Sequence, residues 1–176
     1  MAVDVTAAVD ADIPELADVA ARTFPLACPP SVTEQNIAIF IEETLSEKRF
    51  RDYLNDPDRI VLVARVDDRI VGYALLMRGV PDDDDVQRAV TVLPSVEVSK
   101  IYVLPSSHGS GAAAELMTAA LGRAAETGAA SVWLGVNQQN QRALRFYAKQ
   151  GFAIAGTKTF RLGAGIENDY VMFRTL

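Results

Sequence analysis

The chain has 176 residues, of which 49% are hydrophobic, and it carries a formal net charge of -6. This length buries one sizeable core but is short for two, so a single domain over residues 1–176 is expected. The acidic balance argues against nucleic acid as a partner, because a polyanionic backbone rewards basic patches, whereas it permits attraction of cationic small molecules.

Cysteine and histidine are scarce. Cys28 is the single cysteine and His108 the single histidine, so no intramolecular disulfide is possible and a Cys/His metal site is not expected. The N-terminal "MAVDVTAAVDADIP" has acids where a signal peptide needs basic residues, and no run reaches the roughly 18 apolar residues of a membrane span. A soluble cytoplasmic protein with no membrane partner is expected.

The first third of the chain is predicted to be helical. The segment "DADIPELADVAARTF" (residues 10–24) begins with an Asp cap and an early proline, and its apolar residues recur at helical spacing until the next proline ends the helix. The stretch "PLACPP" (residues 25–30) is too rich in proline to be helical and is predicted to be a loop near the site. Residues 31–57 repeat the helical pattern in two pieces, with Ser31 or Thr33 as the cap.

The middle of the chain is predicted to form strands. Residues 59–80 contain two β-branched runs joined at Asp67 and Asp68, which indicates a hairpin. The acidic run at residues 82–85 is predicted to be a solvated loop without a site, because its spacing is not that of a calcium loop. The segment "SVEVSKIYVL" (residues 95–104) follows as a further strand.

Helices and strands alternate in the last third. An alanine-rich helix is predicted over residues 111–128, a buried strand over 130–136 and a last helix over 137–151. Two strands over 152–160 and 168–176 close the chain. Strands joined by both hairpins and crossovers predict an α/β (α+β) fold, with a mixed sheet that carries helices on its faces.

One loop of this plan has the character of an anion site. In "IYVLPSSHGSGAA" (residues 101–113) an apolar strand breaks at a proline and opens into glycines just before a helix. Such a loop presents a row of backbone N–H groups, and glycines let a ligand approach the backbone closely. Glycine spacing alone is equally compatible with an ordinary turn, since the third glycine of a dinucleotide fingerprint and the Lys-Ser/Thr pair of a P-loop are both missing.

Two motifs in order decide between these alternatives. The stretch "KIYVLPSSHGSGAAAELM" resembles the acyl-CoA signature of the GNAT acetyltransferase superfamily, R/Q-x-x-G-x-G/A, through His108, Gly111 and Ala113, with His108 in place of Arg or Gln. Further on, "NQQNQRALRFYAKQGF" resembles the second signature of that superfamily. The matching residues are Asn140, Ala143, Phe146, Tyr147, Gly151 and Phe152. Over nearly its whole length the chain is similar to bacterial spermidine/spermine acetyltransferases of the PaiA-like kind.

The resemblance implies the GNAT fold, a twisted, mixed, mostly antiparallel sheet in which the fourth and fifth strands splay and acetyl-CoA lies between them. It implies that backbone groups of Ile101, Tyr102 and Val103 pair with the pantetheine amides and that Asn140 contacts the pantetheine arm. It also implies main-chain contacts to the pyrophosphate from His108, Gly109, Ser110, Gly111, Ala112 and Ala113.

Two of these residues have simpler alternatives. His108 supplies less charge than Arg, so weaker cofactor binding is expected, but the side chain is also compatible with an ordinary surface position in the loop. Asn140 stands near a helix start, where a helix cap is the alternative to a cofactor contact.

Tyr147 is the expected general acid. It stands seven residues after Asn140, two helical turns on and therefore on nearly the same face. With an ordinary pKa around 10 it stays protonated at neutral pH and can donate a proton to the departing CoA thiolate. The alternative is a buried Tyr with a structural hydrogen bond.

Glu97 is the expected general base, because it is the one acid inside an otherwise apolar strand. The period of two in a strand places it on one face with Ile101 and Val103, directed toward the active site. The alternative is a rim residue with a salt bridge to Lys100 or Arg65.

These features predict an acetyl-CoA-dependent N-acetyltransferase in which the amine attacks the thioester directly, in a ternary complex. A primary amine of a polyamine or similar small cationic molecule is the expected acceptor. A peptide or protein amine is the alternative acceptor, and a non-catalytic acyl-CoA-binding module is the alternative of another class. A covalent relay through Cys28 is not favoured, because nothing in the sequence supplies an activating base. The sequence leaves open whether the protein is a monomer or a homodimer.

Overall fold

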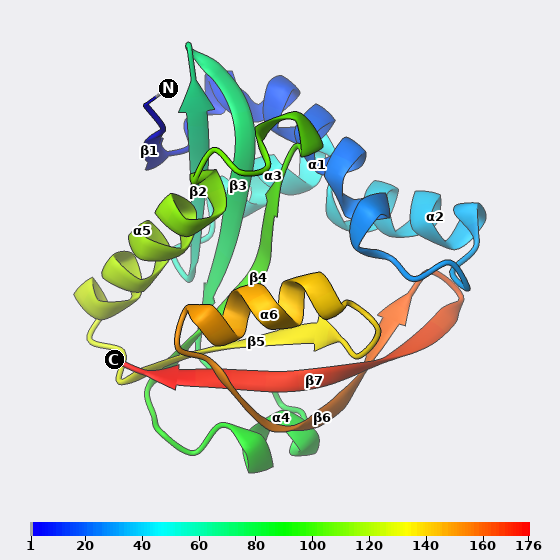
Figure 1. The fold of residues 1–176 in the computed structure, drawn as a ribbon, viewed down its shortest axis with the longest axis vertical. Helices are drawn as coiled ribbons and strands as arrows, with labels where there is room; N and C mark the ends of the chain where they lie inside the picture. Colours follow the sequence, from blue (N-terminus) through cyan, green and yellow to red (C-terminus); the bar gives the residue numbers. More distant parts are fainter. Residues whose placement is uncertain (1) are drawn as a thin grey trace.

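A seven-stranded sheet runs through the computed structural model, which describes residues 2–176 (Figure 1). The strands are β1 (Asp4–Ala7), β2 (Arg59–Val66), β3 (Arg69–Arg78), β4 (Ser95–Val103), β5 (Ser131–Asn137), β6 (Ala153–Leu162) and β7 (Gly165–Thr175). Their order in the sheet is β1-β2-β3-β4-β5-β7-β6, and every neighbouring pair is antiparallel except β4 and β5. The predicted mixed, mostly antiparallel sheet is confirmed.

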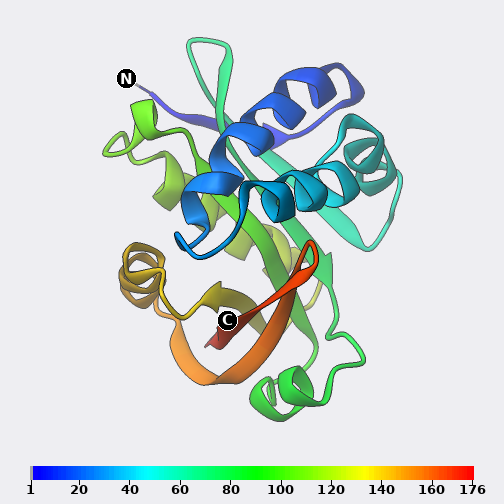
Figure 2. The same cartoon turned by 90° about the vertical axis from the view of Figure 1, so that its right-hand side faces the viewer.

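Helices cover both faces of this sheet (Figures 1 and 2). They are α1 (Ile13–Ala27), α2 (Glu34–Thr44), α3 (Glu47–Leu54), α4 (Asp84–Ala89), α5 (Ala112–Glu126) and α6 (Gln141–Lys149), with short 3-10 turns at Asp10–Asp12 and Pro105–Ser107. The helices α5 and α6 pack on one face and α1, α2 and α3 on the other, while α4 lies against β6.

The caps of α2 and α3 explain why residues 31–57 form two helices. The Thr33 side chain accepts a hydrogen bond from the Asn36 amide at 3.1 Å, and the Ser46 side chain accepts one from the Arg49 amide at 3.2 Å. Each cap satisfies an amide that a helix start leaves without a partner. Thr33 is therefore the cap of α2, and the alternative, Ser31, is not.

The end of α1 differs from the prediction. The proline-rich stretch was expected to be a loop from Pro25 onward, but the helix continues to Ala27. Proline removes a donor and not an acceptor, so in the last turn it costs a single helical hydrogen bond. Its carbonyl still accepts from the Cys28 amide at 3.2 Å. The prediction that this segment lacks helix is wrong by one turn.

The acidic run also differs from the prediction, since it begins a helix instead of staying a loop. The Asp83 carboxylate accepts hydrogen bonds from the amides of Asp85 and Val86 at 2.9 and 3.4 Å, which caps α4. Acidic residues in a first helical turn also interact favourably with the helix dipole. The short edge strand β1 was not predicted, because its four mostly exposed residues carry no apolar pattern.

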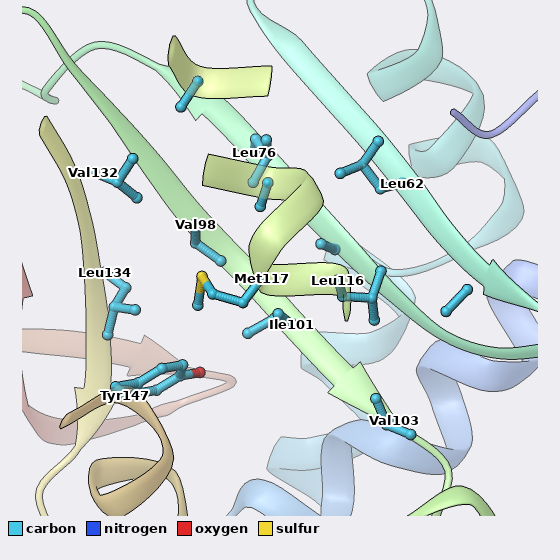
Figure 3. Close-up of a cluster of buried hydrophobic side chains, with 14 of the residues drawn as sticks. Leu62, Leu76, Val98, Ile101, Val103, Leu116, Met117, Val132, Leu134 and Tyr147 are labelled. Atoms are coloured by element: carbon cyan, nitrogen blue, oxygen red, sulfur yellow. The ribbon is translucent and has the colours of Figure 1, made fainter. Parts of the chain in front are cut away.

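Two large hydrophobic cores fill the two faces, and a third, smaller core lies where α4 packs on Trp133 and Val171. On one face Leu116 and Met117 of α5 pack over side chains from β2 to β5 (Figure 3). On the other face, α1, α2 and α3 contribute an aromatic cluster in which Phe24 and Phe40 stack with centroids 4.4 Å apart. These cores hold the sheet independently of any ligand.

The strands β4 and β5 separate after a short contact. Their parallel pairing covers only Ser95 with Ser131, Val96 with Val132, and Glu97 with Trp133. Beyond these pairs β5 turns away from β4 (Figure 1). The predicted splay is therefore present, and it leaves the second half of β4 without a partner on that edge.

A β-bulge in β4 changes which side chains share a face. Leu75 pairs with Lys100 but Leu76 pairs with Val98, so Ser99 is an extra residue. The bulge places Val98 and Ile101 together in the α5-side core, while Lys100 faces the opposite side with Leu75.

The prediction that Glu97 shares a face with Ile101 and Val103 is wrong for this reason. The period of two holds only up to the bulge, and Glu97 lies on the same face as Lys100.

Glycine substitutions test how closely β3 and β4 approach. A side chain at Gly72 would lie 2.7 Å from the Tyr102 carbonyl oxygen and 2.9 Å from Val103 Cγ2. We expect Gly72→Ala to destabilise the fold by about 1–3 kcal/mol through overpacking, with a Tm lower by roughly 2–4 °C for each kcal/mol. Gly122→Ala is the matched control, since nothing lies within 4 Å of a side chain there in α5. Thermal unfolding that shifts both variants equally would contradict the close approach.

Candidate active site

A cavity of about 280 Å³ opens where β4 and β5 separate. Its walls come from the end of α1, the splayed halves of β4 and β5, the loop before α5, the first turns of α6, and the strands β6 and β7. The predicted site residues in its lining are Glu97, Ile101, Tyr102, Val103, His108, Ala113, Asn140 and Tyr147. Residues 109–111 lie in the loop between His108 and α5, and Ala112 begins α5 with its side chain buried in the core. The cavity therefore brings both signature motifs to one place.

The free edge of β4 presents backbone groups from alternate residues. The Leu104 amide donates to the Val71 carbonyl of β3 at 2.7 Å, so the residue two positions earlier, Tyr102, also directs its backbone groups toward β3. Ile101 and Val103 then direct theirs toward the splay. This geometry corrects the expectation for Tyr102, whose main chain is committed to the sheet and which lines the cavity with its ring.

The loop before α5 holds several unpaired amides. The His108 and Ser110 amides donate back into the preceding turn at 3.1 Å each, and the Ala112 amide donates to Ser110 Oγ at 3.3 Å. Between His108 and Ala114, the amides of Gly109, Gly111, Ala113 and Ala114 have no hydrogen-bond partner in the described residues. Gly109 and Gly111 have φ of 86° and 89°, a conformation that favours glycine. The loop is therefore shaped to offer donors to an anion.

His108 is tied to the strand that it follows. Its Nε2 lies 3.0 Å from the Val103 carbonyl oxygen, and since a carbonyl only accepts, Nε2 carries the hydrogen. The side chain is exposed at the surface of the loop, as the alternative has it, while it also lines the cavity and fixes the loop on the end of β4.

Asn140 caps α6. Its Oδ1 accepts from the Ala143 amide at 3.1 Å, as the simpler of its two predicted roles requires. The side chain also lines the cavity, and its Nδ2 has no hydrogen-bond partner in the described chain. The cap orients the amide group and leaves its donors free.

Tyr147 enters the cavity from α6. Its ring is 9% exposed and packs edge-on against Phe146 and Phe152, with centroids 5.5 and 6.1 Å away. Figure 3 shows the hydroxyl directed toward β4. Among residues 2–176 no group hydrogen-bonds this hydroxyl, so the alternative of a structural hydrogen bond is not observed. Burial raises the pKa of Tyr147, which keeps it protonated.

Glu97 stands across the cavity on the other face of the sheet. Burial raises the pKa of its carboxyl group, while the nearby cations Lys100, Lys158 and Arg59 act in the opposite direction. Neither predicted salt bridge forms, because Arg65 pairs with Asp12 and Lys100 forms no ion pair. A carboxyl with a raised pKa is suited to take a proton from an amine.

Two lysines of the site were not predicted. Lys100 is 8% exposed, and burial lowers its pKa to about 8. Lys158 of β6 lies 3.6 Å from Asp169 of β7, and all three side chains line the cavity. One signal was readable: the polar pair at positions 99 and 100 interrupts the alternation between Val98 and Ile101 and marks the bulge.

Cys28 is in the lining but is not activated. Burial, with a smaller effect of Glu167, raises the pKa of its thiol to about 11. The thiol donates to the Phe24 carbonyl at 3.5 Å. The thiolate is the nucleophilic form of cysteine, so this environment disfavours a covalent relay.

Comparison with known proteins assigns the family. Residues 18–152 match the model of the acetyltransferase (GNAT) family. The chain belongs to the GNAT acetyltransferase family. Like other GNAT proteins it is an acetyltransferase. An uncharacterized N-acetyltransferase of Mycobacterium tuberculosis is 61% identical over 165 residues, 94% of this chain and 98% of the relative.

Solved GNAT structures share the fold. A PaiA N-acetyltransferase from Thermoplasma acidophilum, solved in complex with coenzyme A, superimposes with a TM-score of 0.78 at 18% identity over 100% of both chains. The ribosomal-protein-S18-alanine N-acetyltransferase of Escherichia coli gives a TM-score of 0.70 at 18% identity, over 99% of this chain and 94% of its own. Among the helices of residues 2–176, none has the length and apolar character needed to cross a membrane.

The pH dependence of stability tests the burial of Lys100. In the unfolded chain its pKa is near 10.5, so between pH 8 and 10.5 the unfolded state holds a proton that the folded state has released. Stability linked to Lys100 therefore rises with pH across this window, and below it the full cost of burial is present. We expect Lys100→Met to stabilise the protein at pH 7 by about 1–4 kcal/mol, and this advantage to shrink toward pH 10.

Urea unfolding at several pH values measures the difference in the free energy of unfolding between parent and variant. Groups that titrate in the same way in both proteins cancel in this difference. Lys48→Met, at an exposed position on α3, is the control and should give a difference that does not depend on pH. A Lys100→Met difference equally flat with pH would show that Lys100 keeps an ordinary pKa.

Proposed function

We propose that this GNAT protein, acting as one domain over the whole chain, transfers the acetyl group of acetyl-CoA directly to a small primary amine in a ternary complex. The observation that carries this proposal is the placement of Glu97 and Tyr147 in the lining of one cavity, on opposite faces of the splayed sheet. A thioester held between the strands would have a proton acceptor on one side and a proton donor on the other.

The cofactor would be held mostly by the main chain. Backbone groups of Ile101 and the amide of Val103 face the splay and suit the pantetheine amides, while the Val103 carbonyl already accepts from His108. Asn140 offers its free Nδ2. The unpaired amides of Gly109, Gly111 and Ala113, together with the N-terminus of α5, suit the pyrophosphate. A fold neighbour solved in complex with coenzyme A supports a coenzyme A thioester as the acetyl donor.

The chain's own groups would then move the protons. Glu97 accepts a proton from the ammonium group, which frees the lone pair that attacks the thioester carbonyl. As the C–N bond forms and the C–S bond breaks, Tyr147 donates its proton to the departing thiolate, and its oxygen takes up the second proton that the acylated nitrogen loses to become a neutral amide. The raised pKa of Glu97 favours its role as proton acceptor, whereas the raised pKa of Tyr147 keeps the hydroxyl protonated but makes it a weaker donor to the thiolate.

The acceptor is the finer part of the proposal. Similarity to PaiA-like enzymes and the net charge of -6 favour a polyamine or similar small cationic amine. The cavity is too small for a folded partner but leaves room for the end of a peptide. A turnover screen of polyamines, amino acids and peptides, in which acetyl-CoA is present and free thiol is detected, distinguishes these acceptors.

Ala113 tests the anion loop. Acetyl-CoA at about 100 times its dissociation constant should stabilise the parent protein by roughly 2.7 kcal/mol. Ala113→Asp should abolish most of this, because a carboxylate would repel phosphate beside the free amides. Ala113 is half-buried against the α5-side core, so melting of the variant without acetyl-CoA is the check on its folding. Ala113→Ser is the neutral control and should keep the stabilisation. No effect of acetyl-CoA on melting of the parent would refute the proposed cofactor.

Tyr147→Phe separates chemistry from binding. The change keeps the ring and its packing on Phe146 and Phe152 but deletes the hydroxyl. We expect turnover to fall about 100-fold, the lower end of the range for a general acid, because a thiolate is a good leaving group. Acetyl-CoA affinity should stay within a factor of two or so.

Turnover at saturating amine and the acetyl-CoA dissociation constant are the two measurements. Equal turnover in parent and variant would remove Tyr147 from the mechanism. Tight acetyl-CoA binding by a parent that acetylates no amine would favour the non-catalytic binding module.

A further inference from the structure

Two lysines from distant strands lie close together on the α1 side of the cavity, which is here called the acceptor side. Lys100 belongs to β4 and Lys158 to β6, which are separated in the sheet by β5 and β7. Their Nζ atoms lie 5.8 and 5.4 Å from the centroid of the same ring, that of Phe160. Two ammonium groups near one ring repel each other, so their convergence needs a compensating interaction.

Lys158 has its compensation within the fold. Its Nζ lies 3.6 Å from Asp169 Oδ2, and both side chains are largely buried. Gly135 of β5 makes room for it, because a side chain at that position would come within 2.6 Å of Lys158 Cε. The sheet is thus built to lay Lys158 across β5 into the cavity.

Lys100 has no ion pair of this kind, although the charges of Glu97 and Asp169 and the rings of Phe40 and Phe160 partly offset its burial. Its Nζ donates only to the Ser99 carbonyl at 3.1 Å and to Ser99 Oγ at 3.4 Å, and it forms no ion pair with any carboxylate among residues 2–176. A buried ammonium without a counter-ion is costly, and an anion that enters the cavity would offset the cost. The Lys100 ammonium group can therefore form an ion pair with an anionic group of a ligand.

Glu97 is the complement of Lys100. It lies on the same face of β4 because of the bulge, lines the same cavity and also has no ion pair in the described chain. After Lys158 and Asp169 are paired, β4 therefore presents to the cavity one carboxyl group and one ammonium group that form no ion pair among residues 2–176, and Arg142 of α6 also lines the cavity without an ion pair. A molecule that carries both an ammonium and a carboxylate would satisfy the two at once.

We propose that the acceptor is a small zwitterion, a primary amine that also carries a carboxylate, as in an amino acid. Its ammonium group lies at Glu97, which takes the proton, and its carboxylate lies at Lys100. The inference rests on the proposed acetyl transfer, and it replaces the polyamine that sequence similarity and net charge favour with a different class of acceptor. A polyamine, which carries only cations, would gain from Glu97 but would place further positive charge near Lys100 and Lys158.

Matched pairs of acceptors test this directly, because each pair differs by one carboxylate. The pairs are 1,4-diaminobutane with ornithine, and n-butylamine with norvaline. With saturating acetyl-CoA we expect the parent protein to favour the carboxylate-bearing member by about 10-fold to 100-fold in kcat/KM, the range that a charge-assisted hydrogen bond supports. Lys100→Gln should bring the ratio close to one, and Lys48→Gln, at an exposed site outside the cavity, should keep it.

A second measurement does not depend on the variant folding. Pentanoate, which is norvaline without its amine, should inhibit the parent competitively against norvaline. Acetyl-CoA stabilisation of Lys100→Gln shows whether that variant is folded. Three results would each overturn the zwitterionic acceptor while leaving acetyl transfer intact. The parent protein could prefer the diamine, folded Lys100→Gln could keep the preference for the carboxylate-bearing acceptor, or pentanoate could fail to inhibit. A parent that acetylates none of the amines overturns the proposed function itself.

Discussion

The early end of the pairing between β4 and β5 is the constraint on which the site depends. Parallel strands hold each other through evenly spaced hydrogen bonds, and here the ladder stops after Glu97 and Trp133. Each residue beyond that point would cost an unpaired backbone group if it were buried and dry. The open edge is sustained because the two faces of the sheet are packed separately, by α5 and α6 on one side and by α1 to α3 on the other. The fold can therefore leave a gap between strands without losing its core.

The bulge at Ser99 converts this gap into a two-sided site. Without the extra residue, Glu97 and Ile101 would share a face, and Lys100 would point into the α5-side core. With it, the charged side chains of β4 gather on the α1 side while Tyr147 stands on the α6 side. A local defect in one ladder thus separates the proposed base from the proposed acid by the thickness of the sheet, with the splay between them.

Motifs with a local physical cause could be predicted from the sequence. The loop before α5 follows from glycines at positive φ, and Tyr147 follows from its helical spacing after Asn140. Features set by distant segments could not be predicted. The position of Lys158 depends on Gly135, 23 residues earlier and on another strand, and no sequence pattern links the two. The prediction of the face on which Glu97 lies was wrong because the period of two was extended through a bulge. The adjacent polar residues at 99 and 100 indicated this break in the alternation.

The charged side chains in the cavity destabilise the fold, because a stable core buries apolar groups and not isolated charges. Lys100 among the aromatic rings of Phe40 and Phe160, and Glu97 in a site that raises its pKa, both lower the stability of the empty protein. Neither side chain caps a helix, so their burial has no evident structural benefit to the fold. The free energy of desolvating these charged groups is spent when the protein folds. A substrate that pairs with them therefore binds to groups that are already desolvated and in place. The same charges that destabilise the free protein would then select the acceptor.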